Sequence, residues 1–187
     1  KELAQIALSK VLKPGDWRSG YYRDQTLMMA QGLLTVKQFF AALYADTDPA
    51  HEPSSAGRQM GGHFATRFLN DDGSWMDQTT QFNSSADISP TAGQMPRLLG
   101  LAQASKLYRS LPEVTKLKSN FTEGGNEIAV GTIGDASTSE GPFWETMNAA
   151  CVLQVPMLMN VWDDGYGISV PKEYQTTKAS ISEALRG

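Results

Sequence analysis

Residues 127–169 read EIAVGTIGDASTSEGPFWETMNAACVLQVPMLMNVWDDGYGIS, and this stretch decides the fold. Two apolar runs, at residues 128–133 and 155–161, flank a segment with helical character. The first run ends in Gly134-Asp135, and the second ends in Asp163-Asp164-Gly165. Because short apolar runs bounded by turn residues are typical of buried strands, the stretch predicts a strand, a helix and a second strand.

The two predicted strand ends carry acidic side chains that should lie close together. In a strand–helix–strand unit the strands are parallel and end at the same edge of the sheet, so we expect Asp135 and Asp164 to converge on one cation. The beginning of the intervening helix can receive an anion. Mg²⁺ binds through one or two carboxylates together with phosphate oxygens of a ligand. The pattern predicts a magnesium–diphosphate site at this edge.

Each acidic motif taken alone also has a simpler interpretation. Gly134 allows backbone to approach a ligand closely, but Ser137 and Glu140 predict a capping box, which is a plain helix start after a buried strand. The adjacent carboxylates of Asp163 and Asp164 repel each other unless a cation is near, although they also suit a solvated turn. The occurrence of both motifs in this order and at this spacing favours the site.

The composition limits the class of protein. A chain of 187 residues with 41% hydrophobic and 19% charged residues fits one globular domain, which we expect to span residues 1–187. The net charge of −4 argues against nucleic acid as the main partner. The single Cys151 fits a reducing cytoplasm, and no apolar stretch approaches the ~20 residues that cross a membrane. Because the sequence starts without Met inside a helical pattern, we expect a fragment of a longer chain.

The rest of the sequence predicts helices joined by polar segments. Helical patterns occupy residues 3–12, 25–44, 90–108 and 177–185. In the second of these, Gly32 is an interruption, and Thr35 with Gln38 predicts a capping box. We interpret residues 17–24 and 111–125 as polar connections. Residues 46–87 have no period, which is typical of a binding loop, a lid or an insert. We expect an α/β fold with a doubly wound, mostly parallel sheet.

Several motifs follow one another along the chain. They are Tyr22-Arg23, Gly57-Arg58-Gln59-Met60 with His63, ISPTAGQMP at residues 88–96, GDASTSEG at residues 134–141 and DGYGIS at residues 164–169. The series resembles the alpha subunits of thiamin diphosphate-dependent 2-oxo acid dehydrogenases, in which Gly-Asp-Gly precedes Asn-Asn by roughly thirty residues. The resemblance covers nearly the whole chain, apart from an apparent insert around residues 70–81. The Gly-Arg-Gln-Met segment is most similar to the branched-chain members.

This resemblance implies a fold and a function. The fold would be the diphosphate-binding half of a thiamin diphosphate-binding fold. The chain would belong to the decarboxylating component of a 2-oxo acid dehydrogenase complex, an oxidoreductase that passes the acyl group of a small 2-oxo acid to a lipoyl arm. The implied cofactors are thiamin diphosphate and Mg²⁺. The implied partners are a beta subunit or fused beta region, which supplies the activating glutamate, and a lipoyl acyltransferase core, in an alpha2beta2-type assembly.

The resemblance also implies roles for individual residues. Asp135, Asp164 and the carbonyl of Tyr166 would coordinate Mg²⁺. His63 would be the catalytic residue, on a mobile loop at the mouth of the active site. The other cofactor-binding residues would be Tyr22, Arg23, Gly134, Ala136 and Ser137 along the diphosphate, Ser89 and Thr91 near the aminopyrimidine, and Ile168 beneath the cofactor.

The sequence departs from the family pattern at three places. Ala136 replaces a glycine, which is acceptable only if its φ is negative. Asp163-Asp164 replaces Asn-Asn, and Trp162 replaces an arginine that meets the diphosphate in branched-chain members. The site therefore stays negative unless Arg23, the helix N-terminus or another chain supplies positive charge. If Asp163 points away from the metal, we expect it to pair with a base elsewhere.

Three other functions stay open at this point. A transketolase-like thiamin enzyme would carry both halves of the site in one long chain. A Mg²⁺-dependent phosphohydrolase would use Asp135 as its nucleophile. A degenerate cofactor-binding domain would serve assembly without catalysis, and titration with thiamin diphosphate would distinguish it from an enzyme.

Overall fold

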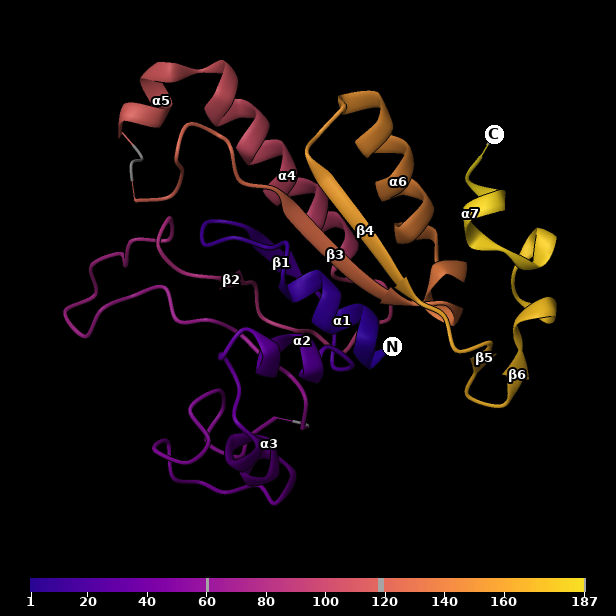
Figure 1. Cartoon of the computed structure of the whole chain (residues 1–187), viewed down its shortest axis with the longest axis horizontal. Helices are drawn as coiled ribbons and strands as arrows, with labels where there is room; N and C mark the ends of the chain where they lie inside the picture. Colours follow the sequence, from indigo (N-terminus) through magenta and orange to yellow (C-terminus); the bar gives the residue numbers. More distant parts are fainter. Residues whose placement is uncertain (60, 118–119, 187) are drawn as a thin grey trace.

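The centre of the computed structural model is a sheet of four parallel strands in the order β2-β1-β3-β4 (Figure 1). The structure describes residues 1–59, 61–117 and 120–186, so Met60 of the predicted motif lies outside the described residues. The strands are β1 (Trp17–Ser19), β2 (Asn83–Ser84), β3 (Ala129–Gly134) and β4 (Met157–Trp162). The parallel sheet confirms the predicted α/β class.

The predicted strand–helix–strand unit is present. Helix α6 (Gly141–Leu153) connects β3 to β4, and these two strands pair in parallel along their full lengths, up to Gly134 opposite Trp162. All six residues of β3 are buried, which explains why this strand reads as an apolar run without polar alternation. The two strands therefore end side by side at one edge of the sheet.

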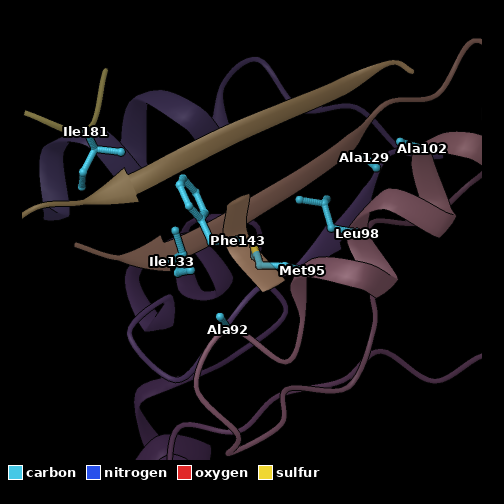
Figure 2. Close-up of a cluster of buried hydrophobic side chains, with 8 residues drawn as sticks. All are labelled: Ala92, Met95, Leu98, Ala102, Ala129, Ile133, Phe143 and Ile181. Carbon is cyan, nitrogen blue, oxygen red and sulfur yellow. The ribbon is translucent and has the colours of Figure 1, made fainter. Parts of the chain in front are cut away.

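Helices cover both faces of the sheet. On one face, Ala129 and Ile133 of β3 pack with side chains of α4 (Met95–Ser110) and α6 (Figure 2). On the other face, Val130 packs with side chains of α1 (Glu2–Ser9) and α2 (Gln25–Ala30). Because successive strand residues point to opposite faces, one strand contributes to both apolar clusters. This arrangement confirms the predicted doubly wound sheet.

The remaining elements are short. They are α3 (Val36–Leu43), α5 (Pro112–Leu117), α7 (Ile181–Ala184), the strands β5 (Tyr166–Gly167) and β6 (Val170–Pro171), and the 3₁₀ turns η1 (Ala136–Ser139), η2 (Lys172–Tyr174) and η3 (Thr177–Ala179). Strands β5 and β6 pair antiparallel as a small hairpin that directly follows the end of β4. Within the described ranges, no helix combines the length and apolar character that a membrane crossing requires.

Two strands occur where the sequence predicted none. Residues 17–24 were predicted as a polar connection, but they contain β1, which lies between β2 and β3. The polar Arg18 in its middle conceals the strand from a hydrophobicity pattern. Strand β2 lies inside the predicted loop at residues 46–87, whose other described residues form turns, bends and one bridge between Leu69 and Trp75.

Several predicted helix limits are also wrong. The helix predicted from residue 90 begins at Met95, because Ala92 adopts a left-handed conformation with φ 60°. Leu107, near the end of this helix, is exposed. The predicted connection at 111–125 contains α5, and the predicted helix at 177–185 is broken at Lys178, where φ is 59°.

The two capping predictions have different outcomes. The Thr35–Gln38 capping box is present and starts α3. The Ser137–Glu140 box is not formed, because η1 occupies residues 136–139 and Glu140 itself is the N-cap of α6, without a side-chain capping bond. The helical turn next to the end of β3 is therefore η1, and α6 begins one turn later.

Candidate functional site

The site lies where β3 and β4 end. Asp135 follows β3 directly, and its side chain is buried, with a relative exposure of the residue of 4%. Asp163 and Asp164 follow β4 directly and are exposed. The register that places Gly134 opposite Trp162 brings the next residues of both strands together. Asp135 thus lies near Asp163 and Asp164 at one edge of the sheet, close enough for their charges to act on its carboxyl group.

The electrostatic environment of Asp135 disfavours its charged form. Burial raises the pKa of the Asp135 carboxyl, the N–H of Ala136 opposes this shift, and the negative charges of Asp163 and Asp164 raise the pKa further. A cation placed among these groups would reverse the contribution of the neighbouring charges. The donor set therefore suits a divalent cation.

Asp163 and Asp164 shape the turn after β4 in similar ways. The Asp163 Oδ1 atom accepts the N–H of Gly165 at 2.9 Å, and the Asp164 Oδ1 atom accepts the N–H of Tyr166 at 3.2 Å. The second carboxylate oxygen of Asp163 accepts a hydrogen bond from Lys172 Nζ at 2.7 Å. The predicted base that pairs with Asp163 is thus Lys172, which sequence reasoning did not identify.

Arg23 supplies positive charge to this edge. Its guanidinium lies over the ring of Tyr22, 4.9 Å from the centroid. A Cβ atom at Gly134 would lie 3.7 Å from Arg23 Nη1 and 3.4 Å from the hydroxyl of Tyr21, so Arg23 reaches the end of β3. Burial lowers the pKa of Arg23, but the neighbouring phenol groups and the Asp164 carboxylate raise it overall. Arg23 therefore lies close enough to Asp164 to feel its charge, and the ring of Tyr22 lies against its guanidinium.

The backbone beyond Asp135 turns tightly. Ala136 is the first residue of η1, so its backbone is helical and satisfies the condition for replacing glycine. Ser137 follows in the same turn, and Thr138 Oγ1 donates to the carbonyl of Asp135 at 2.6 Å. Gly167 of the hairpin packs against Ala136, because an added Cβ would lie 2.7 Å from the Ala136 Cβ.

The position of Ile168 is strained and exposed. It has a φ of 59°, which is rare for a β-branched residue, and its side chain is completely exposed. Tyr166, whose carbonyl was predicted to meet the metal, is also exposed at the start of the hairpin. Both residues lie on the hairpin that follows the carboxylates, so its strands set their distance from the site.

A second group of predicted residues lies on the loops. His63 Nε2 and Ser89 Oγ are 3.1 Å apart, and both residues line one cavity with Asp87. Gly62 packs against Tyr22, since an added Cβ would lie 3.0 Å from the Tyr22 carbonyl. The residue before His63 in the chain therefore lies against Tyr22, which in turn precedes Arg23. Thr91 is exposed just before α4.

A buried ionic network supports these residues, and the sequence did not predict it. Arg18 of β1 contacts the carboxylates of Asp24 and Asp87, and all three side chains are almost completely buried. Trp162 Nε1 donates to Asp24 Oδ1 at 2.7 Å, and Thr132 Oγ1 donates to Asp24 Oδ2. Trp162 therefore points into the core. The only feature of the sequence that could have indicated this network is that Arg18, Asp24 and Asp87 are charged and lie close to the motifs predicted for the site.

No group of three or more His, Cys, Asp or Glu side chains in the described part of the chain is arranged to hold a metal ion. A complete protein cage is, however, not what Mg²⁺ with a phosphate ligand requires, because one or two carboxylates are usual there. Asp135 and Asp164 meet that requirement. The residues present therefore fit a magnesium ion that a phosphate-bearing ligand helps to coordinate.

Comparison with known proteins identifies the relatives of this chain. The "2-oxoisovalerate dehydrogenase subunit alpha" of Bacillus subtilis is 28% identical over 100% of this chain and 47% of its own length. The mitochondrial subunit of the same name from Caenorhabditis elegans is 28% identical over 91% of this chain and 32% of its own length. The "Pyruvate dehydrogenase E1 component subunit alpha" of Acholeplasma laidlawii is 25% identical over 99% of this chain and 40% of its own length.

The chain thus spans less than half the length of these relatives. A family model described as "Dehydrogenase E1 component" matches residues 1–187, which is every residue of the sequence. The match includes both strand ends with their carboxylates and the loops that carry His63 and Ser89. The chain therefore belongs to the dehydrogenase E1 component family.

Proposed function

We propose that this chain binds Mg²⁺ and the diphosphate of thiamin diphosphate, as the diphosphate-binding half of the decarboxylating component of a 2-oxo acid dehydrogenase. One observation carries the proposal: the buried Asp135 at the end of β3 meets Asp164 at the end of β4, beside the guanidinium of Arg23. The family assignment supports this function over the three alternatives named above.

The proposed roles follow from where the residues lie. Asp135, Asp164 and the carbonyl of Tyr166 would hold Mg²⁺. Arg23 would face the diphosphate oxygens, whose negative charge suits the planar guanidinium. Gly134, Ala136 and Ser137 would face the diphosphate with their backbone. The ring of Tyr22 would hold the guanidinium of Arg23 in place. Thiamin diphosphate, when bound, supplies an electron sink for breaking the bond between the 2-oxo carbon and its carboxylate.

The loop residues would act at the other end of the cofactor. Ser89 and Thr91 would line its aminopyrimidine side, and Ile168 would pack against it from the hairpin. His63 would hold or move a proton near the 2-oxo acid, because one imidazole nitrogen can donate a hydrogen bond while the other accepts one. Its contact with Ser89 fixes the position of Nε2. The connection through Gly62 and Tyr22 supports the placement of His63 in the same site.

The substrate and partners belong to the same proposal. The names of the relatives include 2-oxoisovalerate and pyruvate, and the branched-chain-like motif favours a branched 2-oxo acid. We propose that the chain acts in the cytoplasm as one domain, with an insert near residues 46–87. A beta subunit or fused beta region would complete the site in an alpha2beta2-type assembly. The acyl group would then pass to a lipoyl arm of an acyltransferase core.

Titration of the full-length protein with thiamin diphosphate, with and without Mg²⁺, tests the proposal. Quenching of tryptophan fluorescence reports binding, because Trp162 lies directly next to the proposed metal ligands. We expect Mg²⁺-dependent binding that Asp135→Asn abolishes. Asp71→Asn is the matched control, because it removes one carboxylate from an exposed loop. Binding by the wild type that is independent of both Mg²⁺ and Asp135 would contradict the proposal.

The same variants separate the alternatives. A phosphohydrolase would hydrolyse a simple phosphoester in a reaction that Asp135→Asn removes, without any requirement for thiamin diphosphate. A degenerate, non-catalytic domain would show neither Mg²⁺-dependent binding of thiamin diphosphate nor 2-oxo acid-dependent reduction of an artificial electron acceptor in the complete assembly. Our proposal expects the reduction and no phosphoester hydrolysis.

A further inference from the structure

Lys172 is tied to the turn after β4 by two hydrogen bonds. Its N–H donates to the carbonyl of Gly165 at 2.9 Å, and its Nζ donates to Asp163 Oδ2 at 2.7 Å. The β5–β6 hairpin lies between these residues and folds Lys172 back onto the turn. The side chain of Lys172 has a relative exposure of 26%, so it is packed against the turn instead of extending into solvent.

The charge of Lys172 acts on more than one carboxylate. The hydrogen bond to Asp163 raises the pKa of Lys172, burial opposes this shift, and the charges of Asp163, Asp135 and Glu173 add to it. The same bond lowers the pKa of Asp163. Among the three carboxylates, Lys172 thus forms its hydrogen bond with Asp163, and its charge also acts on Asp135.

The two basic residues lie on different sides of the site, each near a different carboxylate. Arg23 approaches from the side of Gly134 and is influenced by Asp164, whereas Lys172 approaches from the hairpin and contacts Asp163. Asp163 has both carboxylate oxygens engaged, one with the N–H of Gly165 and one with Lys172. The Oδ1 atom of Asp164 accepts the N–H of Tyr166. Lys172 thus pairs with Asp163 and not with Asp164, the carboxylate assigned to the metal.

We propose that Lys172 is a positioning residue that neutralises Asp163, so that Asp135 and Asp164 bind the divalent cation while the site still accepts a diphosphate anion. This inference rests on the proposed function. Without Lys172, Asp163 would become a third uncompensated carboxylate beside an anionic ligand. The affinity for the anion would fall, and the affinity for the cation alone would stay or rise.

The opposite signs of these two effects make the proposal testable. The measurements are thiamin diphosphate titration at saturating Mg²⁺, followed by tryptophan fluorescence, and titration of Mg²⁺ alone by calorimetry, both with the full-length protein. For Lys172→Met we expect a dissociation constant for thiamin diphosphate that is about three- to fivefold higher, as for loss of one partly exposed ion pair. The Mg²⁺ affinity of the same variant should be equal or higher.

Three further variants complete the design. Lys172→Arg keeps the charge and should bind thiamin diphosphate like the wild type. The double variant Lys172→Met with Asp163→Asn removes both charges and should recover the lost affinity. Lys10→Met is the matched control, because it removes a positive charge at the exposed end of α1. Circular dichroism of each variant checks that the fold is intact.

The outcomes are distinguishable. Equal thiamin diphosphate affinity of wild type and Lys172→Met would overturn the inference and leave the proposed function in place. Parallel weakening of Mg²⁺ and thiamin diphosphate binding, without recovery in the double variant, would also overturn it, because that result indicates a role in hairpin structure alone. A wild type that binds no thiamin diphosphate would overturn both proposals.

Discussion

Asp135 combines a cost in stability with a function in binding. Its folded-state pKa is raised by burial and by neighbouring carboxylates, so the charged form is less stable in the folded protein than in the unfolded chain. The carboxylate therefore destabilises the metal-free fold at neutral pH, and this penalty disappears as the pH falls through the raised pKa. A cation at the site would offset the same penalty.

We therefore expect Asp135→Asn to raise the melting temperature of the metal-free protein at neutral pH. The difference from the wild type should shrink on acidification and vanish below about pH 4, the ordinary range of an aspartate. Thermal unfolding across this pH range, with chelator present, measures the effect. A difference that grows towards acid pH would show that the sign of the pKa shift is wrong.

Arg18 is the residue whose loss should damage the fold most. It contacts Asp24 at 2.6 Å and Asp87 at 3.0 Å, and burial raises the pKa of Asp87 despite this contact. Arg18→Met would leave two buried carboxylates without their cation, which costs about 3–5 kcal/mol in the free energy of unfolding. Urea denaturation measures this loss.

The control for this prediction is Arg67→Met. Arg67 pairs with Asp71 at 2.5 Å, but the two side chains are 66% and 95% exposed. Removing such a surface pair should change the free energy of unfolding by less than about 1 kcal/mol. Equal losses in Arg18→Met and Arg67→Met would show that the buried network stabilises the fold no more than a surface ion pair does.

For single residues, the sequence pattern indicated where the acidic side chains of the site lie, but it did not indicate the basic residues Lys172 and Arg18. Asp135 and Asp164 each follow an apolar run, so parallel pairing alone brings them together. Lys172 reaches Asp163 only because the β5–β6 hairpin folds back, and two-residue strands leave almost no pattern. Arg18 and Asp87 are 69 positions apart in sequence, so no local signal connects them.

At the scale of the element, α3 depends on its cap. Thr35 Oγ1 accepts the N–H of Gln38 at 3.2 Å, and the Gln38 side chain accepts the N–H of Thr35. Because no described residue of α3 is buried, tertiary packing offers this helix little support. Thr35→Ala should therefore cost about 0.5–2 kcal/mol of local stability.

Hydrogen exchange of the α3 amides measures this loss, because local opening is faster than global unfolding. Ser137→Ala is the matched control: the sequence predicted a similar box there, but the structure places η1 at Ser137 and starts α6 at Gly141. Exchange in α6 should stay unchanged in this variant. Faster exchange throughout the molecule after Thr35→Ala would contradict a local role for the cap.

The helices and strands differ in how well the sequence predicted them. The long apolar β3 and the helix–strand unit that follows it were predicted, since burial on both faces leaves a continuous apolar run. Strand β1 was missed because it has three residues and a charged centre, and its stability comes from Asp24 and Asp87. Capping succeeded at Thr35, where only local bonds matter, and failed at Ser137, where the turn beside the site takes precedence.

At the scale of the whole molecule, Asp24 joins the sheet to the segments around it. It contacts β1 through Arg18, β3 through Thr132 and β4 through Trp162. The same residue is the N-cap of α2, which covers one face of the sheet. Since these segments come from distant parts of the sequence, their joint contact with one carboxylate couples the strands into a cooperative unit.

Trp162→Phe tests this coupling. The change removes the indole N–H that donates to Asp24 Oδ1 at 2.7 Å and leaves a buried acceptor with one fewer donor. The expected loss is about 1–3 kcal/mol in the free energy of unfolding, measured by urea denaturation, with an unchanged denaturant slope. The matched control is Trp75→Phe, which alters a residue that is 52% exposed and should cost less than about 1 kcal/mol. Unfolding of the Trp162 variant in two separate transitions would show that its bond to Asp24 holds together parts that otherwise unfold independently. Equal losses of stability at Trp162 and Trp75 would contradict the proposal that Asp24 couples the strands.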